Sequence, residues 1–294
     1  RLKRRKLTVI DATNVRKEDR AHLVSLAKKQ HALCVAIVLN PGEDVCHDRN
    51  AGRPDRQFGP HVVRNQTAAL KRNIRKLDKE GFRYVYELRT PAEIDAFEIV
   101  RQPLWTDRRA EAGPFDIIGD VHGCCDELET LLANLGYAVV WSQDANGART
   151  CAVTPPAGRR AIFVGDLVDR GPRSPDVLRI VMSMVAGNAA LCVPGNHDVK
   201  FLRWINGRKV QPTHGLDVTI GQMEAEPPAF RNEVRNFIDG LVSHLWLDGG
   251  ALTVAHAGIR ADMIGRSSGR VREFCLYGET TGESDEFGLP VRYN

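Results

Sequence analysis

Three short polar blocks, each placed directly after an apolar run, decide the fold of this 294-residue chain. They are Gly119-Asp120-Val121-His122-Gly123, Gly165-Asp166-Leu167-Val168-Asp169-Arg170-Gly171 and Gly195-Asn196-His197-Asp198. A fourth block, Val254-Ala255-His256-Ala257-Gly258, follows later. The apolar runs predict strands at residues 115–118, 160–164, 189–194 and 251–254. We therefore expect an α/β domain in which the strands deliver acid, imidazole and amide side chains to one sheet edge.

The blocks contain five side chains suited to a pair of divalent metal ions. Two such ions lie about 3.5–4 Å apart and need a bridging anion, a role that we assign to Asp166. Asp120 and His122 are two positions apart, so they point to one side of an extended segment. Asn196 offers a neutral amide oxygen, and His256 offers an imidazole. Paired metal ions at these ligands predict hydrolysis of phosphoesters by an activated water.

Four further residues of the blocks suit the phosphate group and the leaving group. His197 follows Asn196 directly and cannot easily share its metal ion, so we predict that His197 acts as a general acid. Asp169 or Asp198 would orient its imidazole. Arg170 would bind phosphate oxygens through its guanidinium fork.

Composition and charge limit the class of protein. Apolar residues make up 43% and charged residues 27%, which are globular values and argue against disorder. Residues 1–110 carry 24 Lys and Arg against 14 Asp and Glu, a net of +10, whereas residues 111–294 carry 17 against 23, a net of −6. The basic half predicts either a polyanionic partner or a solvated helical surface.

The sequence also bears on location and completeness. It contains no run of 18 apolar residues and no secretory leader, so we expect a cytoplasmic protein without a membrane partner. The seven cysteines include no CxxC pair and are expected to be reduced. The chain begins with Arg1 rather than Met, which predicts a piece of a longer protein.

The front part of the chain shows strand–helix–strand spacing. We predict buried strands at 7–11 and 34–39 and a third strand at 82–88. We also predict helices at 18–30 and 63–79 and a helix start at Thr90-Pro91. A polar, arginine-rich loop is expected over residues 48–61. The nucleotide-binding pattern GxxxxGK[ST] does not occur anywhere in the sequence.

Residues 8–14 and 53–63 resemble the kinase domain of bacterial polynucleotide kinase-phosphatase, an RNA-repair family. The resemblance implies a partial P-loop kinase-like α/β domain at 1–105, a linker at 106–113 and a metallophosphoesterase domain at 114–294. It further implies that Arg49, Arg53 and Arg56 belong to a phosphate-clamping lid. Without a P-loop, no kinase activity is expected, and the chain is expected to be truncated at both ends.

The three blocks in this order are the signature of calcineurin-like metallophosphoesterases, which implies an αββα sandwich. The form of residues 165–171 resembles the branch that contains Ser/Thr phosphatases, diadenosine tetraphosphatases and the polynucleotide phosphatase. Members of this family usually hold a further histidine ligand downstream of His256, and no histidine follows it here. Residues 288–294 therefore suggest an interrupted domain, with partial metal occupancy.

Together these observations predict a metal-dependent phosphatase that acts on 3′/2′-phosphate or 2′,3′-cyclic phosphate ends of RNA or DNA. The resemblance implies two divalent ions, with Mn²⁺ favoured over Ni²⁺, Mg²⁺, Fe or Zn, and a homo-oligomer or an RNA-repair partner protein. A Ser/Thr protein phosphatase or a diadenosine tetraphosphatase-like hydrolase would share every metal ligand. A nucleic-acid-binding fragment with an incomplete site is the non-enzyme alternative.

Overall fold

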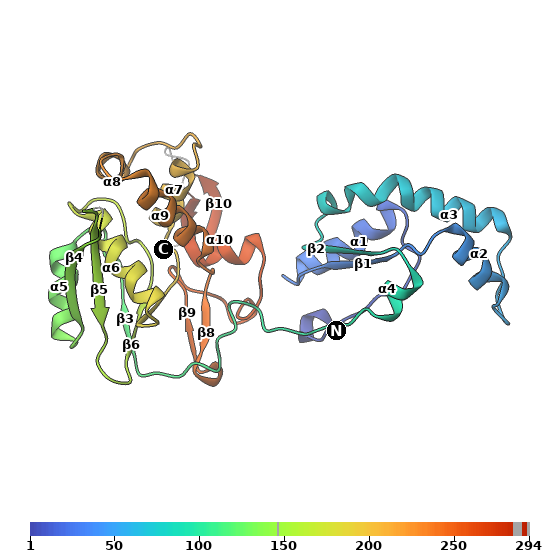
Figure 1. Cartoon of the computed structure of the whole chain (residues 1–294), viewed down its shortest axis with the longest axis horizontal. Helices are drawn as coiled ribbons and strands as arrows, with labels where there is room; N and C mark the ends of the chain where they lie inside the picture. Colours follow the sequence, from blue (N-terminus) through green and yellow to red (C-terminus); the bar gives the residue numbers. More distant parts are fainter. Residues whose placement is uncertain (146, 285–289, 293–294) are drawn as a thin grey trace. The chain divides into compact units, whose positions relative to one another are not determined.

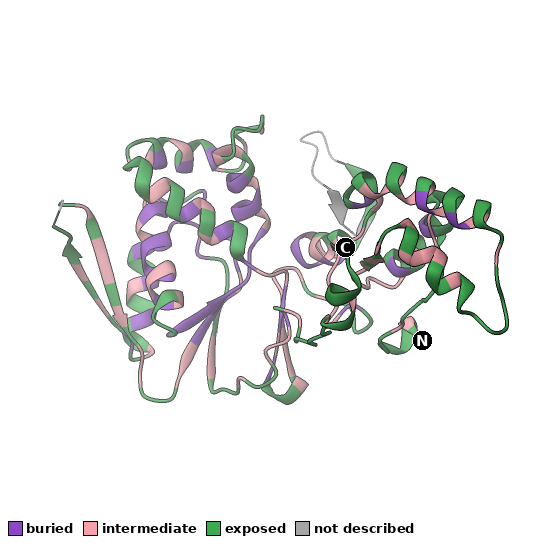
Figure 2. Ribbon diagram, turned by 45° about the vertical axis from the view of Figure 1, so that its right-hand side comes forward, coloured by how far each residue is buried: buried purple, intermediate pink, exposed green. Residues whose placement is uncertain are grey.

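The computed structural model describes residues 1–145, 147–284 and 290–292 and divides the chain into two compact units, Arg1–Gln102 and Pro103–Asn294 (Figure 1). Part of the predicted interrupted end at 288–294 lies outside the described residues. In Figure 2 buried residues gather in the second unit, whereas most residues of the first unit are intermediate or exposed. The two units are therefore described one at a time.

The first unit contains a two-stranded parallel sheet with helices. Its elements are η1 (Leu2–Arg4), α1 (Lys17–Lys29), β1 (Val35–Leu39), α2 (Glu43–Ala51), α3 (Pro60–Asn73), η2 (Ile74–Glu80), β2 (Tyr84–Leu88) and α4 (Pro91–Asp95). The predicted helix start is confirmed, because the Thr90 side chain accepts a hydrogen bond from the Glu93 amide and Pro91 opens α4.

Three predictions for this unit were wrong. Residues 7–11 form no strand among the described residues, and Val9 is 78% exposed. The strand at 34–39 exists but is not buried, because one face of the β1–β2 pair, including Ile37 and Tyr86, is exposed. The loop expected over residues 48–61 is shorter, since α2 continues to Ala51 and α3 begins at Pro60. An apolar run becomes a buried strand only where another element covers it.

The second unit contains more elements. These are β3 (Phe115–Ile118), α5 (Cys125–Asn134), β4 (Ala138–Gln143), β5 (Arg149–Thr154), β6 (Arg160–Phe163), α6 (Ser174–Ala186), β7 (Ala190–Cys192), α7 (Asn196–Ile205), α8 (Leu216–Glu224), α9 (Pro228–Gly240), β8 (Leu245–Leu247), η3 (Asp248–Gly250), β9 (Leu252–Val254), α10 (Gly269–Tyr277), β10 (Thr280–Ser284) and β11 (Pro290–Arg292).

A parallel sheet in the order β3–β6–β7 forms the centre of this unit. Successive side chains of a strand point to opposite faces, so each strand contributes to two cores. Phe163 and Cys192 pack with α5 and α6 in the larger core. Ile162 and Leu191 face the other way and pack with Leu247 of the antiparallel β8–β9 pair. The sheet is thus covered by helices on one face and by a hairpin on the other.

The segment predicted to be a linker is hydrogen-bonded to this unit. Thr106 is fully buried, and its carbonyl accepts a hydrogen bond from the Trp246 amide at 2.9 Å. The Arg108 amide donates to the Trp246 carbonyl at 2.9 Å, and the Asp248 amide donates to the Glu111 carbonyl at 2.9 Å. Residues 106–111 therefore run alongside β8.

The β4–β5 hairpin and the helices α7, α8 and α9 were not predicted from the sequence. The hairpin is only half-buried, and its Val140 side chain is exposed, which weakens the alternation of apolar and polar residues. No helix among the described residues has the length and apolar character needed to cross a membrane.

Burial predicts a large loss of stability on substitution of one isoleucine and a small change for its neighbour in the sheet. Ile162 on β6 is 0% exposed, whereas its register partner Ile117 on β3 is 53% exposed. We expect Ile162→Ala to lower the free energy of unfolding by about 2–5 kcal/mol, because the substitution leaves a cavity. Ile117→Ala should change it by less than about 0.5 kcal/mol.

Tryptophan fluorescence during urea titration measures this difference in the second unit alone, because the chain's 4 Trp residues all lie in that unit: Trp105, Trp141, Trp204 and Trp246. Equal losses for the two variants would contradict the assignment of the buried face.

Candidate metal centre

The predicted ligands meet where the strands of the second unit end. Asp120 and His122 follow β3, Asp166 follows β6, and Asn196 is the first residue of α7 after β7. His256 follows β9. The parallel order β3–β6–β7 places the first three blocks at one sheet edge.

Two glycines of the blocks allow the loops after β6 and β7 to touch. A Cβ atom at Gly195 would lie 2.0 Å from Asp166 Oδ1, and one at Gly165 would lie 2.1 Å from the Gly195 nitrogen. Gly165 also has φ +93°, a conformation that side chains rarely adopt. Glycine at these positions is therefore required for the loops to pack backbone against backbone.

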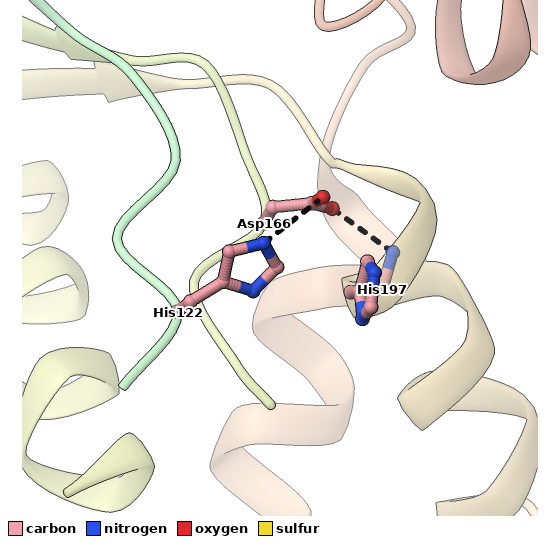
Figure 3. A group of neighbouring side chains, drawn as sticks. All are labelled: His122, Asp166 and His197. Atoms are coloured by element: carbon pink, nitrogen blue, oxygen red, sulfur yellow. Dashed lines mark hydrogen bonds and ion pairs between the residues drawn. The ribbon is translucent and has the colours of Figure 1, made fainter. Parts of the chain in front are cut away.

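His122, Asp166 and His197 form a first group whose candidate ligand atoms lie within 4.8 Å of one another. Figure 3 shows the Asp166 carboxylate between the two histidines, 3.7 Å from His122 Nε2 and accepting a hydrogen bond from the His197 amide at 2.9 Å. His122 Nδ1 donates to the Val168 carbonyl at 2.8 Å, which leaves the lone pair on Nε2. His122 Nε2 is buried and has no hydrogen-bond partner among the described residues.

Asp120, Asp166 and His256 form a second group of the same kind. His256 Nε2 lies 3.6 Å from Asp166 Oδ2 and 3.0 Å from Asn196 Oδ1. His256 Nδ1 lies 2.9 Å from the Val164 carbonyl, which fixes the ring. Asp120 has an exposed side chain and lies 3.9 Å from His256. Asp166 belongs to both groups, which is the position that a bridging ligand requires.

Several predicted site residues have strained backbones. His122, Asp166, Asp169 and Arg170 all have positive φ angles, between 46° and 75°. Such conformations cost about 1–3 kcal/mol each in residues other than glycine and persist only where the surroundings enforce them. These four are among the ten described non-glycine residues with positive φ.

The structure distinguishes the two acids that were considered as partners of His197. Asp169 is fully buried, and its Oδ2 lies 2.7 Å from His197 Nδ1. Asp198 instead accepts hydrogen bonds from the backbone amides of Gly195 (2.8 Å) and Leu167 (2.9 Å). Burial, together with the negative charge of nearby Asp166, raises the pKa of Asp198 to about 7. Asp169 is thus the acid that contacts the imidazole, and Asp198 joins the two loops.

Arg170 lies next to the same histidine. Its Nη2 is 3.5 Å from His197 Nε2, and its side chain is otherwise exposed. A Cβ atom at Gly215 would lie 2.4 Å from the Arg170 nitrogen, so the loop before α8 packs directly on the Arg170 backbone. The guanidinium is therefore free to reach a phosphate group at the edge of the site.

The residues that support this arrangement were not predicted from the sequence. The hydroxyl of the fully buried Thr219 accepts a hydrogen bond from the Asp169 amide at 2.8 Å. Lys200 Nζ donates to the carbonyl and hydroxyl oxygens of Thr213 at 3.0 and 2.9 Å, which ties α7 to the loop that contacts Arg170. These partners lie outside the blocks, and no sequence signal indicates them.

The three arginines of the predicted lid belong to the first unit. Arg49 lies on α2, and Arg53 and Arg56 lie in the segment between α2 and α3. All three are exposed, and the Arg56 guanidinium stacks 5.1 Å above the Phe58 ring. Their role in phosphate binding stays a prediction.

The contact between the two loops gives a test of the site. Gly195→Ala should abolish most of the thermal stabilisation by Mn²⁺, because the added Cβ forces Asp166 out of position. Gly119→Ala lies in the first block, where a Cβ atom meets nothing within 4 Å, so this variant should respond to Mn²⁺ like the original protein. Differential scanning fluorimetry with and without Mn²⁺ measures both. An unchanged Mn²⁺ response of Gly195→Ala would refute the role of this contact.

Comparison with known proteins identifies relatives that match part of the chain. The chain is 43% identical over 182 residues to a bis(5′-nucleosyl)-tetraphosphatase PrpE [asymmetrical] from Anoxybacillus flavithermus, which covers 60% of this chain and 71% of that protein. It is 45% identical over 181 residues to the protein of the same name from Geobacillus thermodenitrificans, with 60% and 70% covered. The Bacillus subtilis protein of that name is 39% identical over 182 residues, with 60% and 71% covered.

These relatives correct the main functional prediction. The prediction of a phosphatase that acts on polynucleotide ends in RNA repair was wrong, because the relatives at about 40% identity are named tetraphosphatases. Their name agrees with the alternative of a diadenosine tetraphosphatase-like hydrolase. The blocks could not separate these classes, since the classes share every metal ligand. The prediction of a phosphoesterase enzyme is confirmed.

Two sequence models of families match the chain. The AAA domain matches residues 1–77, and the calcineurin-like phosphoesterase matches residues 113–287. The predicted fold class, a P-loop-like α/β region followed by a metallophosphoesterase domain, is confirmed. Enzymes of the second family use divalent metal ions, for which the two groups around Asp166 provide ligands. The chain belongs to the calcineurin-like phosphoesterase family.

Proposed function

We propose that this chain is a metal-dependent hydrolase of bis(5′-nucleosyl) tetraphosphates that cleaves them unequally, into a nucleoside triphosphate and a nucleoside monophosphate. The observation that carries the proposal is the 43% identity over 182 residues to a protein with that printed activity. The shared ligand chemistry alone would not select this substrate over other phosphate compounds. The identity extends over 71% of the relative's length, which favours a common substrate class.

The residues around Asp166 fit a pair of divalent ions. Asp120, His122, Asp166, Asn196 and His256 would hold them, and the buried, unpartnered His122 Nε2 is a donor atom that a cation would satisfy. Mixed carboxylate, amide and imidazole donors suit a borderline ion such as Mn²⁺. When bound, the metal ions supply Lewis-acid polarisation of phosphoryl oxygens and activation of water.

The protein's own side chains would handle the proton and the charge. Asp169 accepts from His197 Nδ1 and stabilises the protonated imidazole, so that His197 Nε2 can donate a proton to the leaving phosphate oxygen. Arg170, 3.5 Å from His197 Nε2, would neutralise charge on the same phosphate group. Together the two residues would favour departure of the leaving nucleotide.

A product assay tests the substrate. With saturating Mn²⁺, the protein should convert diadenosine tetraphosphate into equal amounts of ATP and AMP, which ion-exchange chromatography resolves. A phosphoserine peptide and a 3′-phosphorylated RNA oligonucleotide serve as comparison substrates, and both should be hydrolysed more slowly. Release of ADP alone, or faster hydrolysis of the peptide, would overturn the proposal.

A substitution at His197 tests the assigned acid. His197→Gln should lower kcat by about 10²–10⁴-fold, because the general acid is lost. Asp169→Asn should have a smaller effect, about 10–100-fold, because it removes the partner that orients the imidazole. Mn²⁺ content of both variants, measured by atomic absorption, should stay at the level of the original protein. A loss of Mn²⁺ in step with kcat would show that His197 is a metal ligand instead.

A further inference from the structure

A cavity of about 240 Å³ lies on the side of α7 away from the metal centre. Val199, Leu202 and Arg203 of α7 and its C-cap residue Asn206 line it, at the spacing i, i+3, i+4, i+7 that defines one helix face. At 3.6 residues per turn, His197 lies about 200° around the helix axis from Val199. The cavity is therefore distinct from the site described above.

The other walls add charge to the cavity. Arg208 follows α7, Asp239 comes from α9, and Arg272 comes from α10. Three guanidinium groups thus face one carboxylate, a net charge of +2. Arg203 in the last turn of α7 interacts favourably with the helix dipole, but Arg272 belongs to a different helix, so the dipole does not account for the set.

The guanidinium groups of the cavity are not paired with acids. Across the described residues, no carboxylate oxygen lies within 4.0 Å of the Arg203, Arg208 or Arg272 side chains. Arg272 Nη1 donates to the Leu241 carbonyl at 2.9 Å, while Arg203 and Arg208 make no side-chain hydrogen bond there. Arg179 of the same unit, by contrast, binds both carboxylate oxygens of Glu226. Most of the donors in the cavity are thus available to a ligand.

The chemistry of the walls indicates the ligand. Guanidinium forks match the oxygens of phosphate, and several unpaired arginines in one cavity repel one another until an anion joins them. The cavity exceeds the ~30 Å³ share of one water molecule but is smaller than the ~300–1,000 Å³ of sites that enclose drug-sized ligands. Its volume therefore suits a phosphate group together with part of the molecule that carries the phosphate.

We propose that this cavity binds a phosphate group, presented as inorganic phosphate or as the phosphate of a nucleotide. Arg203, Arg208 and Arg272 contact the phosphate oxygens. Val199 and Leu202 form the apolar part of the wall. The site is separate from the metal ligands and requires no bound metal ion.

Titration calorimetry on the whole chain, stripped of metal ions and kept in metal-free buffer, tests the proposal. Inorganic phosphate and AMP are the two probes, and adenosine is the control that lacks phosphate. The double variant Arg203→Gln/Arg208→Gln should bind phosphate probes at least about tenfold more weakly, because charge-assisted hydrogen bonds are lost. Both arginines are exposed, so the variant should fold normally, which circular dichroism verifies.

Arg270→Gln is the matched control, because Arg270 is exposed on α10 two residues before Arg272 and does not line the cavity. This variant should keep the original affinity. Binding of AMP but not of phosphate identifies a nucleotide as the source, and binding of both identifies the phosphate group itself. No binding of either probe, or equal affinity in the double variant, overturns the proposal. Hydrolysis is not measured, so failure here leaves the proposed function untouched.

Discussion

The metal centre depends on one backbone contact, the approach of the loop after β6 to the loop after β7. No side chain fits between Gly195 and Asp166, whose Oδ1 would lie only 2.0 Å from a Cβ atom at Gly195. The contact allows the His197 amide to donate to Asp166 and the Asp198 carboxylate to accept from Leu167 and Gly195. These bonds fix both loops relative to the sheet, and each side chain of the site is positioned from them.

The same contact concentrates negative charge in a dry environment. Asp166, Asp169 and Asp198 are all buried, and the charges of Asp166 and Asp169 both raise the pKa of Asp198. Backbone amides and the imidazole of His197 compensate part of this charge. His122 Nε2 presents a lone pair to the same space rather than a proton. The carboxylates and the imidazole lone pair thus converge on a space with too few hydrogen-bond donors to compensate them. A divalent cation would supply the missing positive charge.

The sequence predicted those features that neighbouring residues determine. Each block followed an apolar strand, so the sheet edge and the meeting of Asp120, Asp166 and Asn196 could be derived without a structure. The role of Asp198 could not, because its partners are backbone amides, one of them from another loop. The strand expected at residues 7–11 failed for a related reason: its apolar residues are exposed, and a strand needs a partner that the pattern does not reveal. The substrate could not be predicted from the motifs, because the motifs indicate only the ligands of metal ions.

Helix α7 connects the metal centre to the arginine-lined cavity, and its geometry places the two on different faces of the helix. Asn196 and His197 open the helix, where its positive end faces the buried carboxylates. At 1.5 Å per residue, Arg203 lies about 9 Å and Asn206 about 13 Å along the axis from His197. At 3.6 residues per turn, Arg203 also lies about 240° around the axis from His197. Arg203 and His197 thus occupy different faces of α7, so a phosphate group held beside the arginines would leave the metal centre open to substrate.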